Sequence, residues 1–144
     1  MFLMAAPLIG SGKTPTIKTY PLGTGASGAS GIAKGDINGD GLLDIVTCNA
    51  STGNISVLLN SGNGSFQSAQ VFPTGGQPES VALADFNRDG KLDVVTANFA
   101  DGTVSVLFGN GDGTFQPHRD FSVGIQTQSV VVGDMNGDGI SDIV

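Results

Sequence analysis

The sequence predicts an all-β fold of consecutive four-stranded antiparallel β-propeller blades, about three blades of an incomplete propeller. The first observation behind this prediction is a nine-residue pattern, D-x-N-x-D-G-x-x-D. It begins at residues 36, 85 and 134, so both intervals are 49 residues. The second is a composition with 23 Gly among 144 residues and many Val, Ile and Thr, which is typical of short strands joined by tight turns. A fixed period of this length indicates a repeat architecture.

The repeat extends well beyond the nine-residue pattern. LDIVTCN at 43–49 corresponds to LDVVTAN at 92–98, and NISVLLNSGNGSFQ at 54–67 corresponds to TVSVLFGNGDGTFQ at 103–116. We therefore divide the chain into four parts: an N-terminal segment 1–30, a first repeat 31–79, a second repeat 80–128 and a truncated third repeat 129–144.

Each complete repeat is expected to hold four strands. In the second repeat they are predicted at Ser80–Asp85, Leu92–Phe99, Thr103–Gly109 and Thr114–Val123. Pro117 marks the fourth as irregular or as an edge strand. Runs such as VALA and VSVLF do not alternate with polar residues, so both faces of each sheet are predicted to be covered by neighbouring repeats. Stacked four-stranded units of this length describe propeller blades.

The segment before the first Asp-rich loop is predicted to belong to the same architecture. Residues 7–25 align without gaps on residues 57–75, with five identical positions. The offset between the two segments is 50 residues, one more than the repeat period of 49. A one-residue insertion between residues 26 and 35 explains the difference. We expect residues 7–25 to form the last two strands of a preceding blade.

The Asp-rich loops are predicted calcium sites. Ca²⁺ prefers six to eight hard oxygen ligands, and positions 1, 3 and 5 of a tight loop can turn side-chain oxygens toward one point. Gly at position 6 permits the sharp turn, position 7 offers its backbone carbonyl, and position 9 adds a carboxylate. The predicted ligands are Asp36, Asn38, Asp40, Leu42 and Asp44 in the first loop, Asp85, Asn87, Asp89, Lys91 and Asp93 in the second, and Asp134, Asn136, Asp138, Ile140 and Asp142 in the third.

Other interpretations of these motifs are weaker. A metal-free polar turn would explain one Asp or Asn but leaves three mutually repelling carboxylates within nine residues. An EF-hand requires flanking helices and Glu at position 12, where this chain has Thr47 and Thr96. The interpretation as a dockerin-like helical loop is rejected for the same reasons. GSGKT at 10–14 resembles the end of a phosphate-binding loop, but Pro7 stands where its first Gly belongs.

Charge and residue types exclude several functional classes. The net charge is −7, and nine of the 13 acidic residues belong to the three loops, so the acidity is local. The six Lys and Arg are scattered, which argues against nucleic-acid binding. Cys48 is the only cysteine and is expected in the core. His118, the only histidine, is expected at the surface. The sequence contains no Ser/His/Asp arrangement, no second His and no paired carboxylates outside the loops, so no enzymatic activity is predicted.

The N-terminal stretch MFLMAAPLI is apolar but too short to span a bilayer. It also lacks the positive residues that begin a signal peptide, so no membrane span and no intact signal peptide are expected.

The loop between two strands, followed by V-S-V-L-x-G-N-G-D-G-T-F, resembles FG-GAP repeats of the VCBS type and the calcium-loop blades of integrin α-subunits. The resemblance covers residues 31–144 and, more weakly, 7–25. It implies Ca²⁺ in each loop, an extracellular or cell-surface location, and a non-catalytic module for cell adhesion or for binding a protein or glycan. A carbohydrate-binding lectin propeller, and the accessory propeller of a larger extracellular lyase or esterase, are the alternatives.

Propellers close with four to eight blades, whereas 144 residues hold about three repeats of 49. The remaining blades must come from a longer chain or from copies that assemble. From the sequence we expect the longer chain, because ending inside a strand leaves an unpaired edge.

Overall fold

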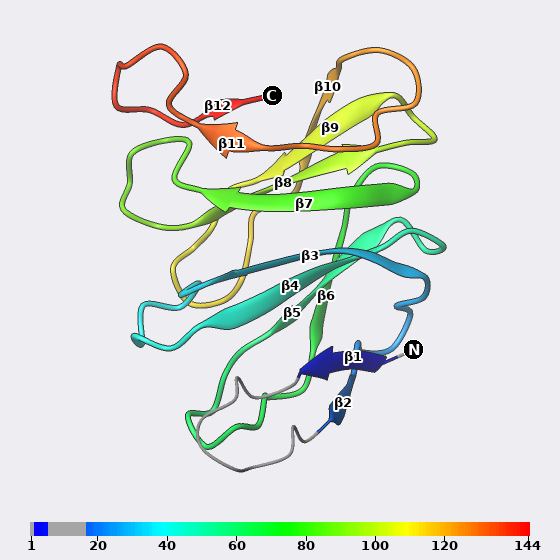
Figure 1. Cartoon of the computed structure of the whole chain (residues 1–144), viewed down its shortest axis with the longest axis vertical. Coiled ribbons are helices and arrows are strands. Elements are labelled where there is room, and N and C mark those ends of the chain that lie inside the picture. The colour runs from blue at the N-terminus through cyan, green and yellow to red at the C-terminus, as the bar shows by residue number, and fades with distance from the viewer. Residues whose placement is uncertain (1, 6–16) are drawn as a thin grey trace.

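The computed structural model describes residues 2–5 by their backbone and residues 17–144 in full. These residues form twelve strands in four antiparallel sheets (Figure 1). The strands are β1 Phe2–Ala5, β2 Lys18–Pro21, β3 Ala29–Gly35, β4 Asp44–Asn49, β5 Asn54–Leu58, β6 Gln70–Pro73, β7 Pro78–Ala84, β8 Asp93–Asn98, β9 Thr103–Leu107, β10 Arg119–Ser122, β11 Val132–Gly133 and β12 Asp142–Ile143. Within the described part of the chain, no helix has the length and apolar character needed to cross a membrane.

Two complete four-stranded sheets form the centre of the molecule. Their strand orders are β3-β4-β5-β6 and β7-β8-β9-β10, so each strand pairs with its neighbour in the sequence. The sheets are stacked face to face, and β11 and β12 lie on the far side of the second sheet (Figure 1). This arrangement confirms the prediction of consecutive antiparallel propeller blades.

The fourth strand of the second sheet is shorter than predicted. It was expected from residue 114, but the regular strand is Arg119–Ser122. Phe115 forms only an isolated bridge with Gly109, and Pro117 lies between this bridge and β10. Proline has no backbone N–H to donate, so it interrupts the pairing, as its position in the sequence indicated.

The N-terminal hairpin also differs from the predicted placement. Two strands were expected within residues 7–25, but residues 6–16 lie outside the described part. Here the second strand is β2, and its partner is β1 at Phe2–Ala5, ahead of the predicted segment. Tyr20 of β2 meets Phe66 edge to face at 4.9 Å between ring centroids, and Phe72 of β6 meets Phe115 in the same way at 5.4 Å. Thus β2 lies against the first complete sheet as β6 lies against the second.

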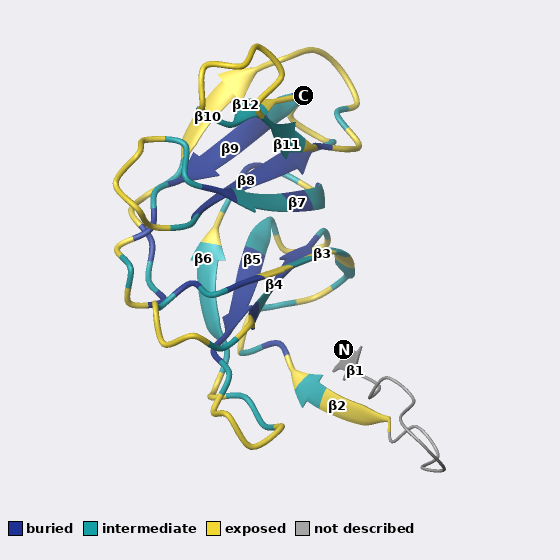
Figure 2. Cartoon of the chain, turned by 60° about the vertical axis from the view of Figure 1, so that its left-hand side comes forward, coloured by how far each residue is buried: buried dark blue, intermediate teal, exposed yellow. Residues whose placement is uncertain are grey.

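Two apolar clusters fill the spaces between the sheets. The first joins Val46, Ile55 and Val57 of the first sheet to Val81, Val94 and Leu107 of the second. The second cluster joins Val95, Ala97, Val104 and Val106 of the second sheet to Val130 beside β11. Because neighbouring residues of β8 face opposite clusters, this strand is buried on both sides (Figure 2). This confirms the interpretation of the continuous apolar runs.

Buried polar side chains join the central strands within each sheet. Asn49 donates its amide to Ser56 Oγ at 2.8 Å, and Asn98 donates to Ser105 Oγ at the same distance one repeat later. All four residues are fully buried. Buried polar groups without partners are costly, so these bonds favour one pairing register between the second and third strands.

Cys48 offers a direct test of how tightly the first two sheets pack. Its side chain is fully buried in the first cluster, and burial raises the pKa of its thiol to about 12. The reactive thiolate is therefore scarce at neutral pH. We expect negligible modification by a thiol reagent in the folded protein and rapid modification in denaturant, measured by mass spectrometry. Rapid modification under native conditions would contradict the packing described here.

Candidate functional site

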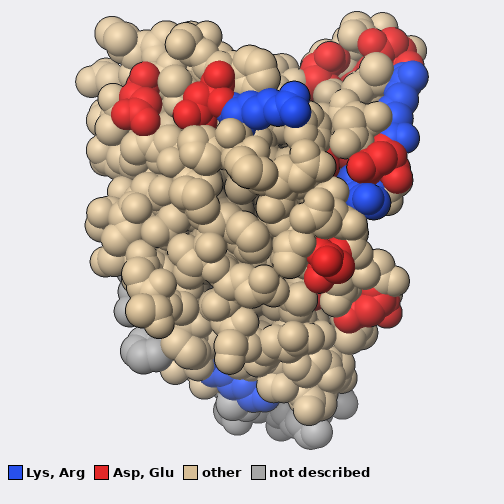
Figure 3. Space-filling model, turned by 180° about the vertical axis from the view of Figure 1, so that it is seen from behind, with Lys and Arg blue, Asp and Glu red and all other residues tan. Residues whose placement is uncertain are grey.

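The three Asp-rich loops lie along one edge of the stack. Each joins the first two strands of its unit: β3 to β4, β7 to β8, and β11 to β12. All three are on the left in Figure 1 and on the right in the reverse view of Figure 3, where acidic side chains follow this edge. Arg88 of the second loop donates to the backbone carbonyl of Asp138 in the third at 2.6 Å. The second and third loops are therefore in direct contact.

The first Asp of each loop accepts hydrogen bonds from the backbone of its own turn. Asp36 accepts from the N–H groups of Gly39, Asp40 and Gly41 at 2.8, 3.1 and 2.9 Å. Asp134 accepts the same three bonds in the third loop, and Asp85 accepts two of them in the second, from the N–H groups of Asp89 and Gly90. In the third loop these bonds, that from Gly139 above all, favour the ionised carboxylate and lower the pKa of Asp134.

The Asn and Asp at positions 3 and 5 also orient the turn. Asn38 Oδ1 accepts from the N–H of Asp40 at 3.1 Å, and Asp40 Oδ1 accepts from the N–H of Leu42 at 2.8 Å. The other two loops contain the equivalent bonds. Gly41 at position 6 has a φ of +83°, a left-handed conformation that glycine adopts without a steric cost. The predicted turn is therefore present in all three loops.

The Asp at position 9 has a role that the sequence did not reveal. Asp93 is fully buried, and its two oxygens accept from the N–H of Phe86 at 3.0 Å and of Gly109 at 2.8 Å. Asp44 is equally buried and binds Ile37 and Asn60 in the same way. Each of these carboxylates thus ties the start of its loop to the end of the third strand of its sheet.

Burial has an electrostatic consequence at this position. Desolvation raises the pKa of Asp93 above its usual range, against the lowering effect of the two N–H donors. The negative charges of Asp89 and Asp85 raise it further. The three carboxylates of the second loop are therefore close enough to repel one another.

The donor set of each loop matches the chemistry of calcium. It contains three carboxylates, one amide oxygen and one backbone carbonyl, all hard oxygen donors. A carboxylate has about four lone-pair positions, and Asp93 and Asp44 each use two of them for the N–H bonds. As the side chains stand, no three acidic, His or Cys residues of the described part converge closely enough to hold an ion.

The structure brings Ser105, Asp120 and His118 together, which the sequence did not indicate. Asp120 Oδ1 accepts from Ser105 Oγ at 2.6 Å and lies 3.0 Å from His118 Nδ1. The order differs from a hydrolase triad, because the aspartate lies between the serine and the histidine. Ser105 is also fully buried. We regard this group as part of the packing between β9 and β10. His118 is half-buried rather than fully exposed.

The polar turn before β10 is self-contained. Asp112 accepts from the backbone N–H and the hydroxyl of Thr114, and these bonds lower the pKa of its carboxyl group. Asn63 and Ser65 form a similar turn before β6. The polar groups of each turn form hydrogen bonds with one another, so local structure explains why these residues are present.

Comparison with known proteins agrees with this arrangement of loops and strands. The FG-GAP-like repeat model matches residues 36–96 and again residues 85–144, together well over half of the chain. The comparison with curated proteins found no match. FG-GAP repeats form propeller blades, generally have no catalytic role and are typical of extracellular proteins, as the sequence resemblance implied. The chain is therefore a member of the FG-GAP-like repeat family.

Proposed function

We propose that this chain is a calcium-stabilised, non-catalytic binding module of a secreted or cell-surface protein, which serves adhesion to an extracellular protein or glycan. The observation that carries the proposal is the set of three loops along one edge of the stack, in each of which the first Asp accepts the N–H of the Gly at position 6. Each loop places three carboxylates and an Asn within nine residues. A bound cation would relieve their repulsion.

The ion would be held by the side chains at positions 1, 3, 5 and 9 and by the carbonyl at position 7. In the second loop these are Asp85, Asn87, Asp89, Asp93 and Lys91. When bound, Ca²⁺ supplies charge neutralisation and cross-links the loop. Asp93 would then connect the ion to the end of β9 through Gly109, so that binding would stabilise the blade. The proposed role of the metal is structural.

Calcium is expected to raise the melting temperature of the chain. A ligand that binds only the folded state stabilises it by about 2.7 kcal/mol at one hundred times its dissociation constant. Thermal unfolding followed by circular dichroism in excess Ca²⁺ and in excess chelator would measure the effect. Asp89→Ala should reduce it, because this exposed carboxylate bonds only within its own loop.

Asp112→Ala is the matched control for this experiment. Asp112 is an exposed acid in a polar turn outside the three loops, so the response to calcium should be unchanged. Identical melting curves in calcium and in chelator would refute the metal-binding part of the proposal. Equal responses of the two variants would show that the ion binds elsewhere.

A further inference from the structure

The second Asp-rich loop differs from the other two at position 4. The first and third loops have glycine there, Gly39 with a φ of +74° and Gly137 with a φ of +79°. The second loop has Arg88, which takes the same left-handed conformation with a φ of +61°. This region is sterically unfavourable for residues with a Cβ atom, and such outliers often mark functional positions. The conformation therefore points to a role for the Arg88 side chain.

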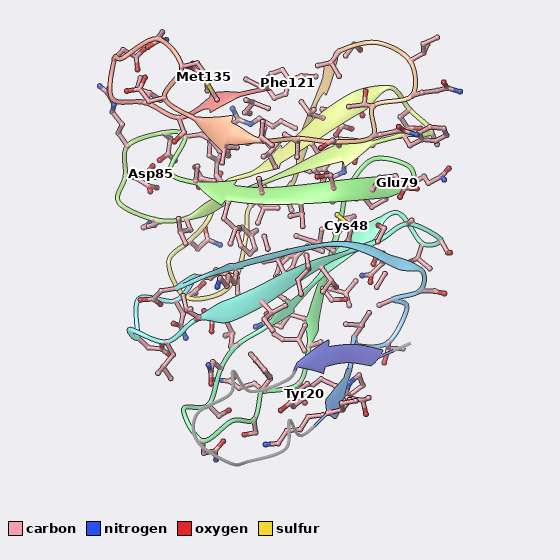
Figure 4. The ribbon with its side chains drawn as sticks, in the orientation of Figure 1. Tyr20, Cys48, Glu79, Asp85, Phe121 and Met135 are labelled. Carbon is pink, nitrogen blue, oxygen red and sulfur yellow. The ribbon has the colours of Figure 1, made fainter. Side chains whose placement is uncertain are left out.

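The side chain of Arg88 extends from its own loop to the next one. Its Nη2 atom donates to the backbone carbonyl of Asp138 at 2.6 Å and lies 4.0 Å from Oδ1 of the same residue. Asp138 is position 5 of the third loop, one of the carboxylates proposed to hold calcium. Figure 4 labels Asp85 in the second loop and Met135 in the third on the same side of the stack. Figure 3 shows basic side chains among the acidic ones along this edge.

Stabilisation of the fold is a weak explanation for this contact. The two side chains are 54% and 49% exposed, and ion pairs between such exposed groups add little to stability. Stacking does not depend on it either. Gly39 has no side chain that could reach the second loop, yet the first two sheets share a buried apolar cluster. The charge of Arg88 is therefore expected to act mainly on a cation bound beside it.

A positive charge at this place opposes the binding of a cation in two ways. Without metal, the guanidinium of Arg88 offsets part of the repulsion among the carboxylates of the third loop, so calcium has less repulsion to relieve. With metal, the guanidinium repels the ion itself. In water, two unit charges 4 Å apart change an equilibrium constant roughly fivefold. Lys91 lies 3.9 Å from Asp89 of its own loop, so its charge acts on the second loop and that of Arg88 on the third.

We propose that Arg88 sets the calcium affinity of the neighbouring third loop and lowers it. Arg88 does not bind the ion and acts through its charge beside the Asp138 carboxylate. The residue at position 4 of one loop thus controls the site one repeat later, and glycine at that position leaves the next site at full affinity. This inference rests on the proposed calcium role of the loops.

A calcium titration followed by NMR resolves the three loops of the chain. The glycine at position 6 of each loop donates its N–H to the first Asp, so its amide signal reports on its own loop. The reporters are Gly41, Gly90 and Gly139. With free calcium fixed by a chelator buffer, the midpoint of each signal gives the apparent affinity of one loop.

Arg88→Gln removes the charge and retains a side-chain N–H donor for the Asp138 carbonyl. Glutamine fits this backbone conformation, since Gln77 and Gln126 have φ values of +56° and +59° in this chain. The Gly139 midpoint should fall to a roughly fivefold lower calcium concentration, the effect expected for one unit charge at this distance. The signal of the first loop should keep its midpoint.

Arg119→Gln is the matched control, because it removes the same charge from an exposed arginine outside the loops. Arg119 belongs to β10 and lies over the ring of Phe108, 5.2 Å from its centroid. All three midpoints should stay at their wild-type values.

Salt dependence separates a charge effect from a structural one. At 1 M salt the screening length is about 3 Å, so the difference between the wild-type chain and Arg88→Gln should largely disappear. A purely structural role of Arg88 would leave this difference unchanged.

Gly39→Arg builds the same arrangement into the first loop. Residue 39 precedes Asp89 by 50 residues, as residue 88 precedes Asp138. A Cβ atom at Gly39 meets nothing within 4 Å, so the only obstacle to the new side chain is the left-handed conformation that Arg88 also takes. The Gly90 midpoint should rise roughly fivefold. Gly39→Gln, the uncharged version, should leave the Gly90 midpoint unchanged.

Three results would each overturn the inference while the calcium role of the loops stands. They are an unchanged Gly139 midpoint in Arg88→Gln, a difference that persists in high salt, and an unchanged Gly90 midpoint in Gly39→Arg. If none of the three glycine signals responds to calcium, the proposed calcium role itself is wrong and the inference about Arg88 is wrong with it. Circular dichroism of every variant would verify that it is folded.

Discussion

Replacing Asp93 with alanine is expected to lower the free energy of unfolding by about 3 kcal/mol, measured by urea denaturation in the presence of a chelator. The substitution leaves the N–H groups of Phe86 and Gly109 without their acceptor. Each buried donor that loses its partner costs roughly 1–3 kcal/mol. Relief of the unfavourable burial of the Asp93 charge offsets part of this loss. The chelator removes any contribution from a bound cation.

Asp142→Ala is the matched control, because Asp142 occupies the same position in the third loop. It is partly exposed and accepts from the N–H of Met135. Water can replace this acceptor, so the expected loss is below about 1 kcal/mol. Equal losses for Asp93→Ala and Asp142→Ala would show that burial does not decide the role of position 9.

Replacing Leu107 with alanine is expected to lower the free energy of unfolding by about 3 kcal/mol as well. Leu107 is 1% exposed and belongs to the cluster between the two complete sheets. Truncating a buried Leu to Ala costs about 2–5 kcal/mol, through lost apolar burial and the cavity left behind. A single shifted transition would show that both sheets unfold together.

The control for this prediction is the same truncation at an exposed leucine. Leu43→Ala removes the same atoms from a side chain that is more than half exposed. It should change the free energy of unfolding by less than about 0.5 kcal/mol. If Leu107→Ala and Leu43→Ala lower the free energy of unfolding by the same amount, the cluster between the sheets is not tightly packed.

The buried aspartates give position 9 two roles in the proposed function. In the metal-free chain, Asp44 and Asp93 fasten their loops to the end of the third strand. With calcium bound, the same carboxylates would also face the ion. A substitution at position 9 should therefore destabilise the folded chain with or without calcium. Asp89→Ala should lower its stability mainly when calcium is present. Comparing these two positions separates the structural role from the metal-binding role.

The repeat period, the all-β class and the positions of the three loops follow from the amino-acid sequence alone. These features depend on residues close together in the chain, such as the Gly at position 6 and the continuous apolar runs of β8 and β9. Turn chemistry and hydrophobic pattern are local, so they can be read without knowing the fold. The family comparison then agreed with the motif that this local pattern contains.

The residues that meet across the sheets are known only from the three-dimensional arrangement of the strands. The acceptors of the Gly109 and Asn60 N–H groups lie 16 residues earlier in the chain, and the partner of β2 is a strand that the sequence did not predict. Such contacts depend on strand register and on blade stacking, which join distant residues and leave no local mark on the sequence.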